Sequence, residues 1–223
     1  MADTSSVKSK SASALPPDDL ARIIARARAD NPDVPHIGLV GDTYSILLSG
    51  KEIDSIMDAS NMQPGPIEAQ MEDPGSTLSI EDCRGALLPI QAPAYANSGY
   101  TAVKSQAVSD GGSHFVGQAV VAFESADQAR AFVSSSAVKW NACARQTVTQ
   151  ISNGKQVRVM IGDLKGNPPK ITQIGLQENR NGEACQRALS AVLNVVFDIG
   201  ACGFHITDDA SRMADAMAAK ATK

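Results

Sequence analysis

Four cysteines at wide and uneven intervals constrain this chain more than any other feature. They are Cys83, Cys143, Cys185 and Cys202. Metal sites use closely spaced cysteine pairs with histidines nearby, whereas the two nearest cysteines here are seventeen positions apart. An even number of separated cysteines, each beside apolar residues, is typical of structural disulfides, which persist outside the reducing cytosol. The sequence therefore predicts two disulfides, no metal site and an extracytoplasmic location.

The pairing of these cysteines has three possible solutions, and the sequence alone does not choose among them. Residues 183–193 are expected to form a helix and residues 194–202 a strand. Folding that helix back over the strand brings Cys185 close to Cys202, which favours a link between them. Cys83 is then left to pair with Cys143.

The composition places the chain among globular domains. With 223 residues it is long enough for one domain with a sizeable core. Its hydrophobic fraction is 43%, but aromatic residues make up only 4%, so we expect a core of small side chains. The net charge of −4 and the lack of a basic cluster argue against nucleic-acid binding. No apolar run approaches the roughly 18 residues of a membrane helix, and no signal peptide is visible.

The N-terminal residues differ from the rest. Residues 1–16 are rich in Ser, Ala and Lys, which cannot bury enough surface to order a chain, so we expect a flexible linker or tether. If the protein is exported, its signal or membrane anchor lies upstream and is absent from this chain. Residues 17–223 are expected to form one domain with its core at about 40–220, and a helix is expected over residues 17–29.

The remaining pattern predicts an α+β class, a single domain with a twisted, mostly antiparallel sheet flanked by helices. Residues 61–75 are expected to form an exposed loop. A capping box, Ser49-Gly-Lys-Glu52, starts one helix. Further helices are expected after Ser79, after Ser125 (one helix, or two with a break near Ser136), over 183–193 and from Asp208. Strands are expected over residues 100–108, 114–123, 146–151, 156–161, 170–177 and 194–202.

Catalytic candidates are weak in this sequence. The three histidines, His36, His114 and His205, are far apart, and no Gly-x-Ser-x-Gly motif accompanies them. A hydrolase needs a nucleophile, a base and an orienting group, and cysteines held in disulfides cannot serve as nucleophiles. We therefore expect no catalytic residue, no cofactor and no enzymatic activity.

Three aromatic residues are candidates for ligand contacts. Tyr95 and Tyr100 flank an Ala-Asn-Ser-Gly stretch before a strand, where a tyrosine offers both apolar area and a hydroxyl. Trp140 is the single tryptophan and precedes Cys143 by one helical turn. Core packing is the competing interpretation for the tyrosines, and covering a disulfide is the competing interpretation for Trp140.

The ordered set of motifs resembles the PknH-like extracytoplasmic sensor domain, found at the C-terminus of a mycobacterial receptor Ser/Thr kinase and in related envelope lipoproteins. The motifs are Leu47-Leu-Ser-Gly-Lys-Glu-Ile53, Leu78-Ser-Ile-Glu-Asp-Cys83, Gln118-Ala-Val-Val-Ala-Phe123-Glu-Ser-Ala-Asp-Gln-Ala129, Trp140-x-x-Cys143, Cys185-Gln-Arg-Ala-Leu189 and Asn194-Val-Val-Phe-Asp-Ile-Gly-Ala-Cys202. The resemblance covers about residues 40–220. It implies one domain with two disulfides and a large cleft, exposed outside the plasma membrane and attached to it through a tether.

The function that this resemblance implies is non-catalytic ligand sensing. A small molecule or an envelope component is the expected partner, with self-association as a further mode. The alternative is a cell-surface protein–protein interaction module without a small-molecule ligand.

Overall fold

The computed structural model describes residues 46–72, 75–178 and 182–222. The predicted linker, the helix expected over residues 17–29 and His36 lie outside these ranges. The helices of the described part are α2 (Gly50–Met57), the 3-10 helix η2 (Glu81–Cys83), α3 (Arg84–Leu87), α4 (Ala92–Tyr95), α5 (Ala126–Cys143) and α6 (Asp209–Ala221). The strands are β1 (Gln63–Glu68), β2 (Ser76–Leu78), β3 (Tyr100–Ser109), β4 (Phe115–Phe123), β5 (Thr147–Ser152), β6 (Lys155–Ile161), β7 (Lys165–Asn167), β8 (Lys170–Gln177), β9 (Glu183–Val192) and β10 (Val195–Phe204).

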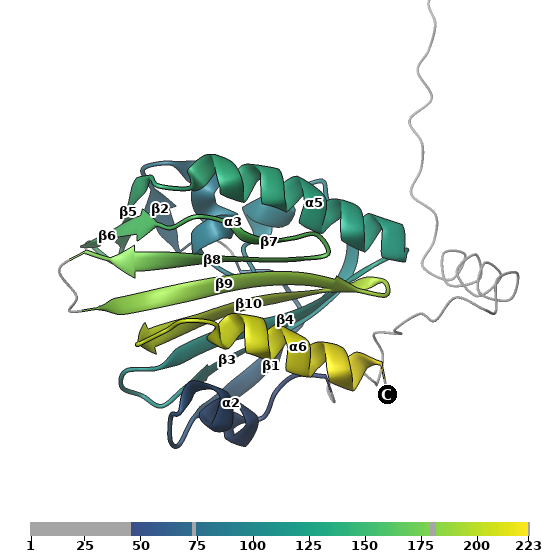
Figure 1. The fold of residues 1–223 in the computed structure, drawn as a ribbon, viewed down its shortest axis with the longest axis horizontal. Coiled ribbons are helices and arrows are strands. Elements are labelled where there is room, and N and C mark those ends of the chain that lie inside the picture. Colours follow the sequence, from purple (N-terminus) through teal and green to yellow (C-terminus); the bar gives the residue numbers. More distant parts are fainter. Residues whose placement is uncertain (1–45, 73–74, 179–181, 223) are drawn as a thin grey trace, which may run out of the picture. The chain divides into compact units, whose positions relative to one another are not determined.

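These strands form one sheet, which confirms the predicted α+β class. Their order is β1-β3-β4-β10-β9-β8-β6-β5-β2, and β7 pairs with β8 outside this path. Every pairing between named strands is antiparallel. The hairpin of β9 and β10 lies in the middle, with β8 on one side and β4 on the other (Figure 1).

Helices cover both faces of the sheet, and each face has its own apolar core. On one face, Ile53 and Met57 of α2 join Met213 and Met217 of α6 against Phe197 and its neighbours. Figure 1 shows α6 running along β9 and β10. On the opposite face the short helices η2, α3 and α4 and the long helix α5 pack over residues such as Val121 and Leu189. We call this second face the α5 face.

Two helix starts, those of α2 and α5, follow the capping chemistry that the sequence predicts. At α2, the Ser49 hydroxyl accepts from the Glu52 amide, and the Glu52 carboxylate accepts from the Ser49 amide, so both halves of the capping box are present. At α5, the Ser125 hydroxyl accepts from the Gln128 amide. α5 is one continuous helix through Ser136, and it places Trp140 and Cys143 on the buried side.

The helix predicted over residues 183–193 is wrong, because this segment is strand β9. Its ten residues pair with β10 without interruption, from Glu183 opposite Phe204 to Val192 opposite Val195. Most of β9 is buried because helices cover both faces of the sheet there. A strand buried on both faces loses the apolar/polar alternation that marks strands, and its apolar residues can then match helical spacing as well.

The loop predicted over residues 61–75 is also wrong in part, because residues 63–68 form the edge strand β1. Pro64 and Pro66 made the segment resemble a loop. Proline is tolerated on an edge strand because one side of such a strand needs no donor for the ladder. The sequence predicts neither of the two three-residue strands, β2 and β7.

Both favoured disulfides are confirmed. Cys83 at the end of η2 is bonded to Cys143 at the end of α5, and the two residues are 60 positions apart. Cys185 is bonded to Cys202, but the predicted helix–strand geometry is wrong. These two cysteines are direct register partners in the β9–β10 hairpin. The pairing was therefore correct although the structure expected around it was not.

Candidate functional site

A buried ion pair lies on the α5 face. Arg187 of β9 and Asp198 of β10 are 2% and 1% exposed, and Nη2 of Arg187 donates to Oδ1 of Asp198 over 2.6 Å. The guanidinium also donates to the carbonyls of Gly85, over 3.2 Å, and of Ile199. It lies 5.3 Å from the centre of the Trp140 ring. A buried charge needs such partners, because an unpaired one is strongly destabilising.

The second oxygen of Asp198 holds the segment that follows α3. Oδ2 accepts from the backbone amide of Ile90 and from the Tyr95 hydroxyl, each over 2.9 Å. Burial, and then the negative charge of Asp198, raises the pKa of Tyr95 well above its ordinary value of 10. Tyr95 therefore remains a neutral hydrogen-bond donor to Asp198 throughout the physiological range.

Residues Leu88–Gln91, which we call the strap, cross the sheet beside this ion pair. Pro89 lies so close to the strands that a Cβ at Gly117 would be 2.9 Å from its Cγ, and a Cβ at Gly200 would be 3.0 Å away. Gly117 and Gly200 are register partners on β4 and β10. Because neither residue has a side chain, the Pro89 ring can pack directly on the backbone of the two strands. Ile90 has a φ of 62°, which is unusual for a β-branched residue. The hydrogen bond that its backbone amide donates to the Asp198 carboxylate stabilises that conformation.

One cavity of about 600 Å³ lies between α5 and residues 80–95. Cys83, Tyr95, Phe132 and Trp140 contribute to its wall, together with Arg187. The polar groups of its inner wall are largely bonded to other protein groups. Arg84, for example, donates to Glu81, Gln91 and the Ser76 carbonyl. We call this the first cavity.

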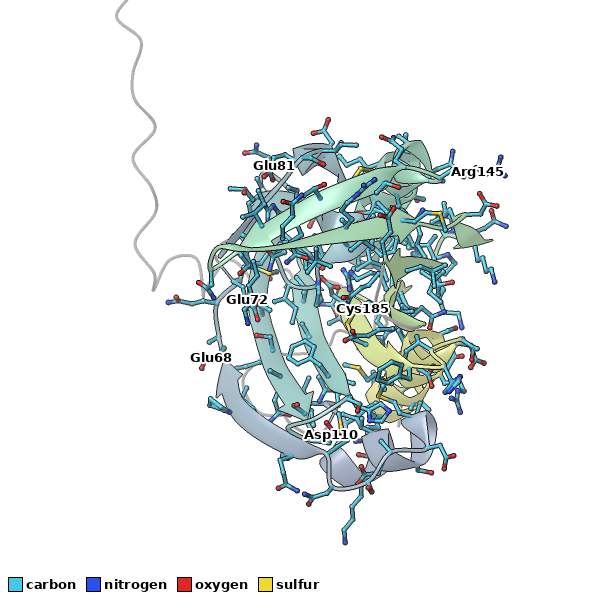
Figure 2. All side chains as sticks on the ribbon, turned by 90° about the vertical axis from the view of Figure 1, so that its left-hand side faces the viewer. Glu68, Glu72, Glu81, Asp110, Arg145 and Cys185 are labelled. Atoms are coloured by element: carbon cyan, nitrogen blue, oxygen red, sulfur yellow. A yellow bond between two sulfur atoms is a disulfide. The ribbon has the colours of Figure 1, made fainter. Side chains whose placement is uncertain are left out.

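A second cavity of about 470 Å³ lies on the other side of the strap, and Arg187 and Leu88 border both spaces. Its floor is mostly apolar and includes Leu87, Val159, Gly200 and the Cys185–Cys202 disulfide. Phe115, 43% exposed, stands on the β4 side. In Figure 2, Cys185 is labelled between the β5–β6 hairpin and strand β4, and all three contribute residues to this cavity.

The rim of the second cavity carries four polar side chains that form no hydrogen bond or ion pair with other described residues. They are Gln150, Asn153, Lys155 and Gln177, from β5, β6, β8 and the turn between the first two. In the part of the chain that the structure describes, none of these four side chains has a hydrogen-bond or ion-pair partner. Neutral amides above an apolar floor are the combination that orients a small ligand in a pocket.

The structure brings two of the three predicted aromatic residues together. Tyr95 and Trp140, 2% and 3% exposed, both line the first cavity. Tyr95 stacks on Phe132 with ring centres 4.4 Å apart, and Trp140 packs on Arg187 beside the Cys83–Cys143 disulfide. Tyr100 is 36% exposed at the start of β3 and meets Tyr95 edge to face at 5.9 Å, but it does not line either cavity.

Apart from Cys185 and Cys202, the residues that border the second cavity were not identified from the sequence. Gln150, Asn153 and Lys155 belong to a hairpin that the Asn153-Gly154 turn does predict. Nothing local shows, however, that this hairpin faces Phe115 on β4, which lies four places from β6 and five places from β5 in the strand order of the sheet. Of the three histidines, His114 lies in the β3–β4 turn, with its Nδ1 2.8 Å from Oδ2 of Asp110, and His205 follows β10. Within the described ranges no cluster of three or more His, Cys, Asp or Glu side chains is arranged to hold a metal ion.

Comparison with known proteins gives a consistent result. A family model described as the PknH-like extracellular domain matches residues 41–220. Two similar proteins are both named serine/threonine-protein kinase PknH, one from Mycobacterium bovis and one from Mycobacterium tuberculosis. Each is 45% identical over 182 residues, which is 80% of this chain but only 30% and 29% of the kinases. The chain thus matches less than a third of the length of these relatives.

A solved structure agrees with the sequence matches. The crystal structure of the extracellular domain of PknH from Mycobacterium tuberculosis superposes with a TM-score of 0.78 at 44% identity. The match covers 82% of this chain and 97% of that domain. Among the described residues, no helix is both long and apolar enough to cross a membrane.

Proposed function

This chain belongs to the family of PknH-like extracellular domains, and from that membership we propose that it is a non-catalytic sensor that binds a ligand outside the membrane. The family and the solved relative are both extracellular domains, so the matched region of the kinases is their extracellular part and not the catalytic one. This chain is accordingly an extracellular domain. Its binding role and its signalling role are the proposal.

The observation that carries this proposal is the contrast between the two cavities. Asp198, Arg187 and Tyr95 at the wall of the first cavity already satisfy one another. The second cavity instead has an apolar floor, and the four polar side chains of its rim have no hydrogen-bond or ion-pair partner among the described residues. A ligand binds more tightly to polar groups that have no hydrogen-bond partner in the free protein. If a group had to give up an existing hydrogen bond, its buried partner would be left unsatisfied, which costs free energy. We therefore place the ligand in the second cavity.

The chemistry of this cavity describes its ligand. Phe115 and the floor favour a molecule with an apolar face, and the Gln150 and Gln177 amides favour hydroxyl or carbonyl groups on its opposite edge. A small envelope component with one apolar and one polar side fits this description. If the parent protein is a receptor kinase, ligand occupancy would bias the association of membrane-tethered chains and thereby signal inward.

Native mass spectrometry tests the binding proposal. The oxidised protein is incubated with a fractionated lipid and glycan extract of mycobacterial envelopes and sprayed under gentle conditions. We expect a discrete mass adduct that Gln150→Ala/Gln177→Ala abolishes. Lys139→Ala, a matched change beside the first cavity, should leave the adduct intact. An adduct that the glutamine variant retains and the lysine variant loses would place the ligand in the first cavity instead.

A protein–protein interaction module is the second candidate, supported by a different surface. Met160 and Leu176 are register partners on β6 and β8, and they are 45% and 40% exposed on the face opposite the second cavity. Ile151 of β5, 47% exposed, projects from the same face. Sedimentation velocity over a wide concentration range tests this candidate. Dimerisation that Met160→Lys abolishes would favour it over the small-molecule proposal.

A further inference from the structure

The two disulfides lie in different surroundings. Cys83 and Cys143 are 0% and 3% exposed, enclosed between η2 and α5. Cys185 and Cys202 are half-buried, and both residues line the second cavity. A solute in that cavity therefore reaches the Cys185–Cys202 bond without any opening of the fold. Thiol–disulfide exchange depends directly on such access.

The strands around the Cys185–Cys202 bond hold both sulfurs in place without it. Cys185 and Cys202 are one of ten consecutive register pairs between β9 and β10. β8 pairs with the outer side of β9, and β4 pairs with the outer side of β10. Because the hairpin is hydrogen-bonded on both sides, breaking the sulfur–sulfur bond leaves the two thiols opposite each other. They remain positioned to form the bond again.

Cys83–Cys143 has no comparable support. It joins η2 to α5, two elements connected by packing and not by a shared ladder. Both cysteines belong to the buried core that contains Trp140 and Val148. Cys83 and Cys143 also line the first cavity, but they are only 0% and 3% exposed, so a thiol in that cavity has far less access to their sulfurs than a thiol in the second cavity has to those of Cys185 and Cys202. The same protein thus carries one half-buried disulfide and one disulfide that is almost completely buried.

From this difference we infer that Cys185–Cys202 is a thiol–disulfide exchange site for a low-molecular-weight thiol that enters the second cavity. The thiolate of the small molecule attacks one of the two Sγ atoms and forms a mixed disulfide with it. The original sulfur–sulfur bond breaks, and its electron pair stays on the other Sγ, which becomes a thiolate and takes up a proton. A second thiol molecule then releases the first as its own disulfide. In total, two thiols are oxidised to one disulfide and the protein disulfide is reduced to two cysteines.

The exchange would change the cavity itself. The mixed disulfide fills part of the floor beneath Phe115 and the glutamine rim, so an adduct and a ligand would compete for the same space. The proposal does not rest on the ligand proposal, because it requires only access to the sulfurs. A domain that binds no envelope component would still show the exchange.

The test follows both disulfides in the folded protein. The oxidised protein is exposed to 2-mercaptoethanol, free thiols are trapped with iodoacetamide at intervals, and non-reducing peptide mapping assigns each cysteine. We expect Cys185–Cys202 to exchange at least tenfold faster than Cys83–Cys143, with a transient mixed disulfide on Cys185 or Cys202. Near-ultraviolet circular dichroism of Trp140, beside the protected bond, should stay unchanged meanwhile.

Two results would overturn the inference. One is equal exchange rates for the two disulfides, and the other is exchange of Cys185–Cys202 only as the Trp140 signal is lost. Cys185→Ala/Cys202→Ala provides a second check: this variant should form no adduct while it remains folded. Should it fail to fold, the relative rates in the unaltered protein still decide the question.

Discussion

Arg187 and Asp198 form an ion pair across the central hairpin, with 2.6 Å between Nη2 and Oδ1, and this pair organises most of the α5 face. Asp198 holds Ile90 and Tyr95, and Arg187 holds the Gly85 carbonyl and packs on Trp140. The two charges therefore anchor the strap and both short helices beside it to the sheet. Arg187 also lines both cavities, whereas Asp198 lines only the first.

Removing one partner of this pair should be severe. Asp198→Ala leaves the Arg187 charge buried without a counter-ion and frees the Ile90 amide and the Tyr95 hydroxyl. We expect a loss of about 3–5 kcal/mol in the free energy of unfolding, measured by urea denaturation. Asp163→Ala is the matched control, because it breaks a solvent-exposed pair with Arg145 and should leave the midpoint unchanged. Equal effects of the two changes would contradict the role of Asp198.

The close packing of Pro89 on Gly117 and Gly200 can be tested by adding one methyl group at Gly117. Gly117→Ala places a Cβ 2.9 Å from Pro89 Cγ and should cost about 1–3 kcal/mol of stability by overpacking. Gly75→Ala meets no atom within 4 Å and should stay within about 0.5 kcal/mol of the unaltered protein. Pro89→Ala should restore part of the loss in a double variant, measured as a coupling energy in thermal denaturation. Purely additive effects would show that the strap does not rest on Gly117.

The two disulfides should differ in their contribution to stability as well as in their reactivity. Chain-entropy arguments give about 4 kcal/mol for the 60-residue separation of Cys83–Cys143 and about 3 kcal/mol for the 17-residue separation of Cys185–Cys202. Cys83→Ala/Cys143→Ala should therefore lower the unfolding free energy more than Cys185→Ala/Cys202→Ala. Guanidinium denaturation of both double variants measures the difference. The reverse order would show that native strain or residual structure outweighs loop entropy.

The β3–β4 turn should make stability depend on pH in the acidic range. The contact with the His114 side chain, followed by the backbone amides of His114 and Gly112, lowers the pKa of Asp110 from 3.8 to about 2. Because the folded state holds this proton less tightly than the unfolded state, the stabilisation is present above about pH 4 and is lost as pH falls toward 2. Asp110→Asn removes this contribution. Its urea midpoint should fall less between pH 4 and pH 2 than that of the unaltered protein.

Local chemistry in the sequence determined much of this fold. The capping residues Ser49 and Ser125 fix two helix starts because their hydroxyls satisfy amides only a few residues away. The Asn153-Gly154 turn and the glycines after Asp110 determine two hairpins in the same local way. The cysteine spacing was sufficient to identify two disulfides. The ordered motifs were sufficient to identify the family.

Only the tertiary structure decided that residues 183–192 form a central strand and which side chains face the cavities. Residues 183–192 are a strand because β8 and β10 pair with them and helices bury both faces, and a single sequence shows neither condition. Arg187 and Asp198 look like surface charges until the hairpin brings them together inside the protein. Gln150 and Gln177 likewise gain their common cavity from strands that are distant in sequence. Local signals specify turns and caps because those involve neighbouring residues, whereas burial and cavities depend on contacts between segments that the chain order does not reveal.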